Sequence, residues 1–138
     1  MPRYITSTRA APSPKSARYS HAVVAGELLH VTGQLPVNPE KPDAPLPADI
    51  AEQAEIVFAN LRIITEDAGF SLGNTVFVRI YLRNFERDYT GFNTVYDRHF
   101  PDDARLPART TVGVAALGRG ALVEVDIVVA ATAADDSR

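Results

Sequence analysis

The apolar residues of this chain recur at two different periods, and the order of these periods restricts the possible folds. From Ile50 to Ala68 they return at steps of three and four, which is typical of one buried stripe on an α-helix. Asp49 stands before this stripe with Glu52 three residues later, in the form of a capping box, and Gly69 follows as a stop signal. The pattern therefore predicts a helix with one face packed against another layer.

Several other segments alternate between apolar and polar residues with a period of two, which indicates β-strands. In residues 75–82, this alternation places Val76 and Val78 on one face and Phe77 on the other. Tight hairpin turns are predicted at Gly26-Glu27 and, between the last two strands, at residues 118–120. The other predicted strands are residues 3–8, 21–25, 28–32, 108–114 and 122–130.

A second, shorter helix is predicted after Asp88, with Pro101 at its end. The elements then follow in the order β, β, β, α, β, α, β, β. This order favours a two-layer α+β domain in which both helices cover one face of a mixed β-sheet. The apolar positions of the second helix are Tyr89, Phe92, Val95, Tyr96 and Phe100.

The length of 138 residues fits one domain, residues 1–138, with a small and polar tail at residues 131–138 that we expect to fray. In this arrangement, the face of the sheet away from the helices still carries apolar side chains. Self-association is the simplest way to cover them, although the alternative that a few are simply exposed stays open. These side chains are Phe77, Tyr81, Val112, Val114 and Val128.

Charge and composition exclude several classes of protein. The net charge is −3 and no basic run occurs, which disfavours tight binding of nucleic acid. No cysteine is present, so disulfides, thiolate metal sites and a cysteine nucleophile are excluded. No apolar run approaches the roughly 18 residues of a membrane span, and residues 1–15 lack the apolar core of a signal peptide. We therefore expect a cytoplasmic protein with no membrane contact.

The histidines do not predict a metal site. His21, His30 and His99 are not spaced as metal ligands with one another or with carboxylates, so each is more simply a packing or surface residue. The chain also lacks a nucleophile elbow of the form G-x-S-x-G and a glycine-rich phosphate loop. We expect no bound metal.

Two charged side chains in predicted strands are the strongest candidates for function. Arg109 lies at the start of a strand that should be mostly buried, where an unpaired guanidinium is costly. It therefore binds either a ligand anion or an internal carboxylate on the neighbouring strand, Glu124 or Asp126. Because these two acids alternate with Val123 and Val125, they share one face, which lines a cleft, an interface or solvent.

Several short segments occur in the order and at the spacing found in one known family. Over residues 12–131 the chain resembles the reactive-intermediate deaminase family, also called Rid or YjgF-type. Each segment alone is weakly specific, but their conjunction in order is a strong signal. The segments are Tyr19-Ser20-His21-Ala22, Val31-Thr32-Gly33-Gln34-Leu35-Pro36, the helix with Gln53, Asn60 and Leu61 that closes in Ala68-Gly69, Phe92-Asn93-Thr94-Val95-Tyr96, Pro107-Ala108-Arg109 and Val123-Glu124-Val125.

The resemblance implies a chorismate-mutase-like fold that assembles as a homotrimer, with an inner barrel of sheets and a site at each subunit interface. It also implies hydrolysis of small 2-imino acids, or of enamines such as 2-aminoacrylate, to 2-oxo acids and ammonia without any cofactor. By the same resemblance, Arg109 binds the substrate carboxylate as a bidentate fork, and Glu124 positions or activates the attacking water. The other implied substrate-binding residues are Tyr19, Gly33, Asn93 and Thr111.

Some positions around the implied site depart from the family pattern. Many members have Cys where Thr111 stands and Glu where Gly113 stands, and residues 117–119 also differ. Because of these departures, the resemblance does not determine the identity of the substrate. Three alternatives therefore remain: a larger enamine substrate specific to one pathway, a trimer that binds small carboxylates or acts like a chaperone without catalysis, and a ribonuclease, which the acidic balance disfavours.

Overall fold

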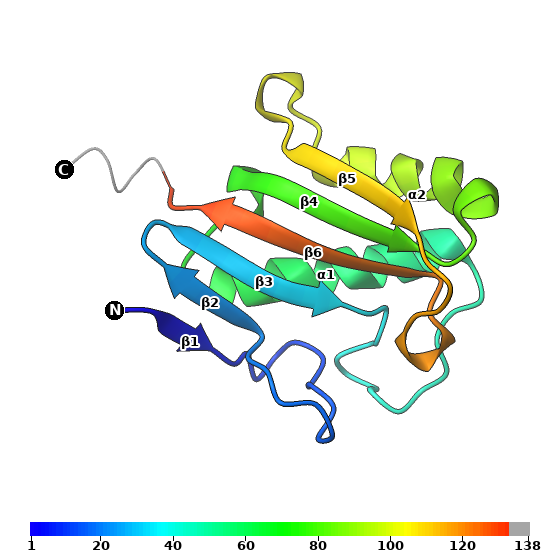
Figure 1. The fold of residues 1–138 in the computed structure, drawn as a ribbon, viewed down its shortest axis with the longest axis horizontal. Coiled ribbons are helices and arrows are strands. Elements are labelled where there is room, and N and C mark those ends of the chain that lie inside the picture. Colours follow the sequence, from blue (N-terminus) through cyan, green and yellow to red (C-terminus); the bar gives the residue numbers. More distant parts are fainter. Residues whose placement is uncertain (133–138) are drawn as a thin grey trace.

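The structure, a computed structural model, describes residues 1–132, so the expected frayed tail falls mainly outside the described residues. The elements follow the predicted order. Both α-helices lie on the same side of one six-stranded sheet (Figure 1), which confirms the two-layer α+β fold. The strands are β1 (Arg3–Ile5), β2 (Ala22–Ala25), β3 (Leu28–Gln34), β4 (Thr75–Leu82), β5 (Ala108–Gly113) and β6 (Val123–Ala130), and the helices are α1 (Ile50–Asp67) and α2 (Phe85–His99).

The strands lie in the spatial order β1-β2-β3-β6-β4-β5, which differs from their order in the chain. β6 runs antiparallel to β3 on one side and to β4 on the other, whereas β4 and β5 run parallel. A parallel pair needs a crossover connection, and α2 supplies it on the helical side of the sheet (Figure 1). The last strand in sequence, β6, therefore lies in the interior of the sheet.

Helix α1 begins and ends where the sequence pattern predicts. The Asp49 side chain accepts a hydrogen bond of 2.7 Å from the backbone N–H of Ala51, which caps the first turn. Gly69 follows the helix with a φ of 86°, a left-handed conformation that glycine adopts without steric cost. Local signals were therefore sufficient to place this helix.

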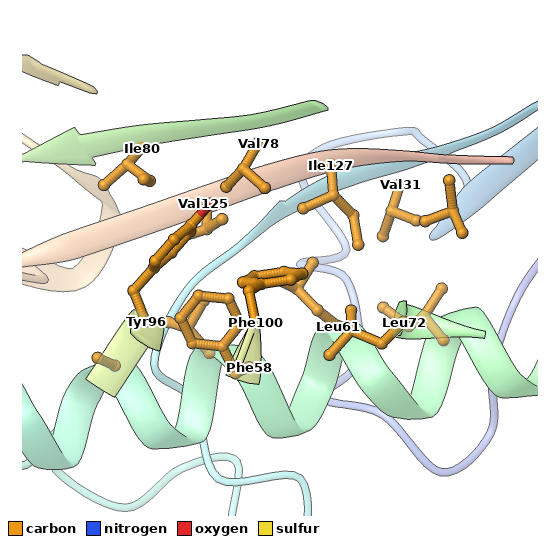
Figure 2. Packing of buried hydrophobic residues seen from close by; sticks show 14 of the residues in the cluster. Val31, Phe58, Leu61, Leu72, Val78, Ile80, Tyr96, Phe100, Val125 and Ile127 are labelled. Carbon is orange, nitrogen blue, oxygen red and sulfur yellow. The ribbon is translucent and has the colours of Figure 1, made fainter. Parts of the chain in front are cut away.

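The core lies between the helices and the sheet, and its centre is aromatic. Phe58 of α1 is fully buried, and its ring stacks on His99 with a centroid distance of 4.6 Å. Phe92, Tyr96 and Phe100 surround the same ring at centroid distances of 6.0, 6.2 and 5.9 Å. In Figure 2 the rings of Phe58, Tyr96 and Phe100 lie between α1 and the sheet. Both helices therefore share one core.

Two details of the predicted strands are wrong. Residues 118–120 do not join β5 and β6 as a hairpin, because β4 lies between these strands; they form a 3₁₀ turn instead. Val76 does not join the buried face of β4. A register shift between Thr75 and Phe77 adds an irregularity to the strand and leaves Val76 43% exposed.

The predicted start of α2 is also wrong, because the helix begins at Phe85 and not after Asp88. Glu86 and Asp88 lie in its first turn, where negative charge stabilises the positive end of the helix dipole. The Asp88 carboxylate is 4% exposed and pairs with Arg87 at 2.9 Å. Neither α2 nor any other helix in residues 1–132 is long and apolar enough to cross a membrane.

The face of the sheet away from the helices is partly apolar, as predicted. Val112 on this face is 38% exposed, and Phe77, Tyr81 and Val128 are half-buried. The same face carries Arg79, whose guanidinium carbon lies 5.9 Å from the centre of the Phe77 ring. No helix among residues 1–132 covers this surface, which we call the open sheet face.

Replacing Phe58 by Ala removes the ring around which the aromatic core packs. We expect the free energy of unfolding to fall by about 3–5 kcal/mol, because a fully enclosed cavity relaxes only in part. Urea denaturation of both proteins at equal concentration measures this change. The control Tyr4→Ala, at a side chain 71% exposed, should change stability by less than about 0.5 kcal/mol. A loss as small as that of the control would contradict this description of the core.

Candidate functional site

The first cluster of predicted site residues lies between the edge strand β5 and helix α2. Arg109 stands opposite Val78 in the parallel β4–β5 pairing, and Val78 is fully buried on the helical side. Because directly paired residues on neighbouring strands point to the same face, Arg109 also points toward the helices, and so does Thr111 two residues later. Both side chains therefore face α2, which carries Asn93.

The guanidinium of Arg109 is held by neutral groups. Its Nε donates a hydrogen bond of 2.8 Å to the hydroxyl of Thr111, and its Nη2 donates one of 2.5 Å to the side-chain oxygen of Asn93. Its Cζ atom lies 4.5 Å from the centre of the Tyr96 ring, a cation–π contact. Among residues 1–132, no carboxylate forms an ion pair with Arg109. The positive charge is therefore oriented but not neutralised.

The internal salt bridge that the sequence left open for Arg109 is wrong for the described residues. β4 separates the strands of Arg109 and Glu124, and Glu124 stands opposite Tyr81 on the open sheet face. Asp126 binds other partners, because it accepts a hydrogen bond of 3.0 Å from the Tyr81 hydroxyl and pairs with Arg79 at 3.3 Å. The sequence predicted that the two acids share a face, and the strand order places Arg109 on the opposite one.

Glu124 and Gly33 form a second cluster across the β3–β6 pair, where the pairing is irregular between Val31 and Gln34. A Cβ atom added at Gly33 would overlap the Glu124 carboxylate, so glycine allows this carboxylate to lie against the backbone of β3. Within residues 1–132, the carboxylate has no hydrogen-bond or ion-pair partner. Burial raises the pKa of Glu124, and the negative charge of Asp126 raises it further.

Tyr19 lies close to this second cluster. It is 46% exposed and lines, together with Gly33, a cavity of about 640 Å³ at the end of β3. Cavities of several hundred cubic ångströms are the usual size of ligand sites. The structure therefore brings the predicted site residues together in two separate groups. One group is Arg109, Thr111 and Asn93, and the other is Glu124, Gly33 and Tyr19.

Tyr96 is a residue of this cluster that was not predicted from the sequence. It follows Asn93 by three positions on α2, so both side chains lie on the same side of the helix, and this spacing was the available signal. Burial raises the pKa of the Tyr96 hydroxyl, against a smaller opposite effect of Arg109. Tyr96 is therefore a neutral ring against which the charged Arg109 rests.

The three histidines are packing or surface residues. His21 is 3% exposed, His30 is exposed, and His99 rests on Phe58 with its Nε2 at 2.8 Å from the Glu55 carboxylate. In the part of the chain that the structure describes, no three His, Asp or Glu side chains gather in a way that would hold a metal ion. The expectation of metal-free activity stays a prediction.

The surroundings of Glu124 predict an unusual titration. We expect its carboxyl carbon to titrate, by NMR, above the ordinary glutamate pKa of 4.5. Because this pKa is raised by folding, Glu124 contributes stability below its unfolded pKa, and the contribution is lost as the pH rises through the folded pKa. Asp126→Asn removes a negative charge and should lower the Glu124 pKa in part, since burial remains.

Glu40→Gln, in the exposed loop after β3, is the control and should leave this titration unchanged. A Glu124 pKa at or below 4.5 in the unsubstituted protein would contradict this description of the carboxylate.

Comparison with known proteins agrees with the fold and the motifs. The model of the Endoribonuclease L-PSP family matches residues 8–131. Protein MMF1, mitochondrial, of Saccharomyces cerevisiae is 37% identical over 122 residues, which cover 88% of this chain and 80% of the yeast protein. The 2-iminobutanoate/2-iminopropanoate deaminase of Dermatophagoides farinae is 34% identical over 128 residues, which cover 93% of this chain and 96% of the mite protein.

Solved structures show the same architecture. The crystal structure of yeast Mmf1 matches with a TM-score of 0.86 and 32% identity, over 96% of this chain and 100% of the yeast chain. E. coli TdcF with bound serine matches with a TM-score of 0.85 and 26% identity, over 94% of this chain and 99% of the other. The motifs, the fold and the match over residues 8–131 together show that the chain belongs to the endoribonuclease L-PSP family, the reactive-intermediate deaminase (Rid, YjgF-type) family of its sequence motifs.

Proposed function

We propose that this protein hydrolyses 2-imino acids to 2-oxo acids and ammonia. The observation that carries the proposal is the guanidinium of Arg109, which Thr111 and Asn93 orient and which no carboxylate neutralises within residues 1–132. A charge in this state favours binding of a small external carboxylate. The deaminase name of the mite relative and the serine bound to TdcF support this substrate class.

We infer that a complete site needs two copies of the chain. Arg109 faces α2 at the edge strand β5, whereas Glu124 lies beside Gly33 on the open sheet face, so one chain does not bring the two charges together. A closed homotrimer would cover the open sheet face and set the β5 edge of one copy beside the Gly33 cavity of the next. Arg109 and Glu124 of neighbouring copies would then act on one substrate.

Each charged group has a separate task in this site. Arg109 binds the substrate carboxylate through the N–H donors that Thr111 and Asn93 leave unused, which fixes the imine carbon in position. Glu124 of the neighbouring copy holds a water molecule beside this carbon. Because its pKa is raised, ionised Glu124 is a stronger proton acceptor than an ordinary glutamate.

The reaction then needs only proton transfers and one water. Glu124 accepts a proton from water while the water oxygen bonds to the imine carbon and the C=N electron pair moves to nitrogen. The same carboxyl group returns this proton to nitrogen and leaves a carbinolamine. In a second transfer, Glu124 takes the hydroxyl proton and gives it to the amine, so that the C–N bond breaks, ammonia leaves and the carbonyl forms.

Binding of carboxylates without catalysis is the alternative closest to this proposal. Glu124 favours catalysis, because a negative charge beside a bound carboxylate weakens binding. A variant with Gln at this position should therefore lose turnover without losing affinity for 2-oxobutanoate. The cytoplasmic location stays a prediction, and the similar yeast protein MMF1 is named mitochondrial.

Arg109→Ala tests the proposed carboxylate contact. A threonine dehydratase generates 2-iminobutanoate, and semicarbazide traps the imine that escapes hydrolysis. Loss of a desolvated charged contact costs about 2–5 kcal/mol, so kcat/KM should fall about thirtyfold or more. Arg109→Lys should recover little, because an ammonium group does not reproduce the planar fork.

Arg62→Ala, at an exposed position of α1, is the matched control and should retain full activity. If Arg109→Ala lowered the melting temperature but kept the kcat/KM of the unsubstituted protein, Arg109 would be a structural residue.

Mixed oligomers test whether one site uses two copies. Arg109→Ala and Glu124→Gln should each have strongly reduced activity alone, but oligomers that contain both variants should regain activity. In these oligomers, some interfaces join an intact Arg109 of one copy to an intact Glu124 of the next, about a quarter of all sites for random assembly around a closed ring. Each variant reassembled with itself is the control. No recovery in mixed trimers verified by native mass spectrometry would show that the site lies within one chain.

A further inference from the structure

We propose that the cavity beside Gly33 binds the side chain of the substrate, and that the protein prefers 2-imino acids with large apolar side chains over those with a methyl group. This inference rests on the proposed function and names its substrate class. The size and lining of the cavity, the hydrogen bonds of two buried polar side chains and the loop at the outer wall of the cavity support this preference.

The cavity of about 640 Å³ extends from Gly33 between residues 11–15 and residues 35–43. A methyl group would leave most of this space to water. A branched or aromatic side chain would instead remove apolar surface from water on both partners, which is favourable in proportion to the area buried. The apolar lining residues are Ala11, Pro12, Pro14, Leu35, Val37 and Pro42.

Two of the polar side chains that line the cavity, the buried His21 and Gln34, are hydrogen-bonded within the protein. His21 accepts a hydrogen bond of 2.9 Å at Nδ1 from the backbone N–H of Ser7, and its Nε2 lies 2.9 Å from the carbonyl oxygen of Ala11. The amide nitrogen of Gln34 donates to the carbonyl oxygen of Thr32 at 3.0 Å. Because their donors and acceptors are already engaged, His21 and the amide nitrogen of Gln34 offer no new hydrogen bond to a polar substituent. This part of the cavity therefore favours an apolar substituent.

Arg119 holds the outer wall of the cavity in place. Its φ of 58° lies in the left-handed region, which is unfavourable for a residue other than glycine. In this conformation its guanidinium donates hydrogen bonds of 2.8 and 3.1 Å to the carbonyl oxygens of Pro42 and Ala44. Arg119 thereby ties the proline-rich loop of residues 36–47 to the segment before β6 and keeps this loop at the cavity margin.

Gly118 keeps the neighbouring part of the wall clear. A Cβ atom at this position would lie 3.1 Å from Cδ1 of Leu35, closer than an ordinary van der Waals contact. A residue with a Cβ atom would therefore require the end of the Leu35 side chain to shift by a few tenths of an ångström. Gly118 and Arg119 are thus two lining residues that shape the outer wall of this cavity.

The test compares kcat/KM for imines made in place by an L-amino-acid oxidase from alanine, leucine and phenylalanine, with catalase present and semicarbazide as the trap. We expect the leucine-derived imine to exceed the alanine-derived imine by at least about tenfold, which is what one added methylene contributes in an apolar pocket. Equal values, or a preference for the alanine-derived imine, would overturn the inference and leave the proposed function in place. Hydrolysis of none of the imines would overturn the proposed function itself.

Val37→Phe fills the cavity and should abolish the preference for leucine-derived imine, with turnover of the alanine-derived imine retained. Pro14→Phe repeats this test from the opposite wall, at an exposed position where folding is not at risk. Val76→Phe, at an exposed position outside the cavity, is the matched control and should change neither value. If either filled variant kept both the preference for the leucine-derived imine and the melting temperature of the unsubstituted protein, the substrate side chain would bind elsewhere.

Discussion

The alternation of side chains along β6 is the constraint on which the rest of the structure depends. Val123, Val125 and Ile127 are buried against the helices, so Glu124 and Asp126 must point to the open sheet face. Because β6 lies between β3 and β4, these acids lie within the sheet and not at its rim. A one-residue shift of β6 would bury both acids in the aromatic core, so the hydrophobic packing also positions Glu124 and Asp126.

The parallel pairing of β4 and β5 places the Arg109 guanidinium on the other face of the sheet, toward the helices. The crossover through α2 brings Asn93 and Tyr96 to the face of β5 on which Arg109 lies. Neutral acceptors and an aromatic ring compensate part of the cost of removing a guanidinium from water, but they do not cancel its charge. The fold thus holds a cation and an acid on opposite faces of the same sheet, a separation that assembly of copies can remove and a single chain cannot.

The cavity beside Gly33 adds selectivity to this arrangement. Glycine at this position leaves room for the Glu124 carboxylate against the backbone of β3, and the cavity opens from the same point. Its outer wall depends on a left-handed Arg119 that two backbone carbonyls retain. The acid needed for the proposed chemistry and the space proposed for the substrate side chain therefore meet at one residue of β3.

The sequence by itself determined the helices, the strands and their order, because periodicity, the cap at Asp49 and the stop at Gly69 are local signals. It also determined that Glu124 and Asp126 share a face, since alternation needs no partner strand. Apart from the β2–β3 hairpin at Gly26-Glu27, which the structure confirms, it did not determine which strands are neighbours. Residues 118–120 look like a hairpin turn, but a turn sequence does not specify pairing, and β4 lies between the strands that they connect.

The partner of Arg109 was likewise open from the sequence, and of the two alternatives the salt bridge to Glu124 or Asp126 is not formed within residues 1–132. Only the tertiary structure decided this point, because β4 and α2 together turn Arg109 toward neutral groups on the helical face. The start of α2 and the irregularity at Val76 were missed for a related reason. Both depend on how the ends of an element pack against residues distant in sequence, which local propensity does not contain.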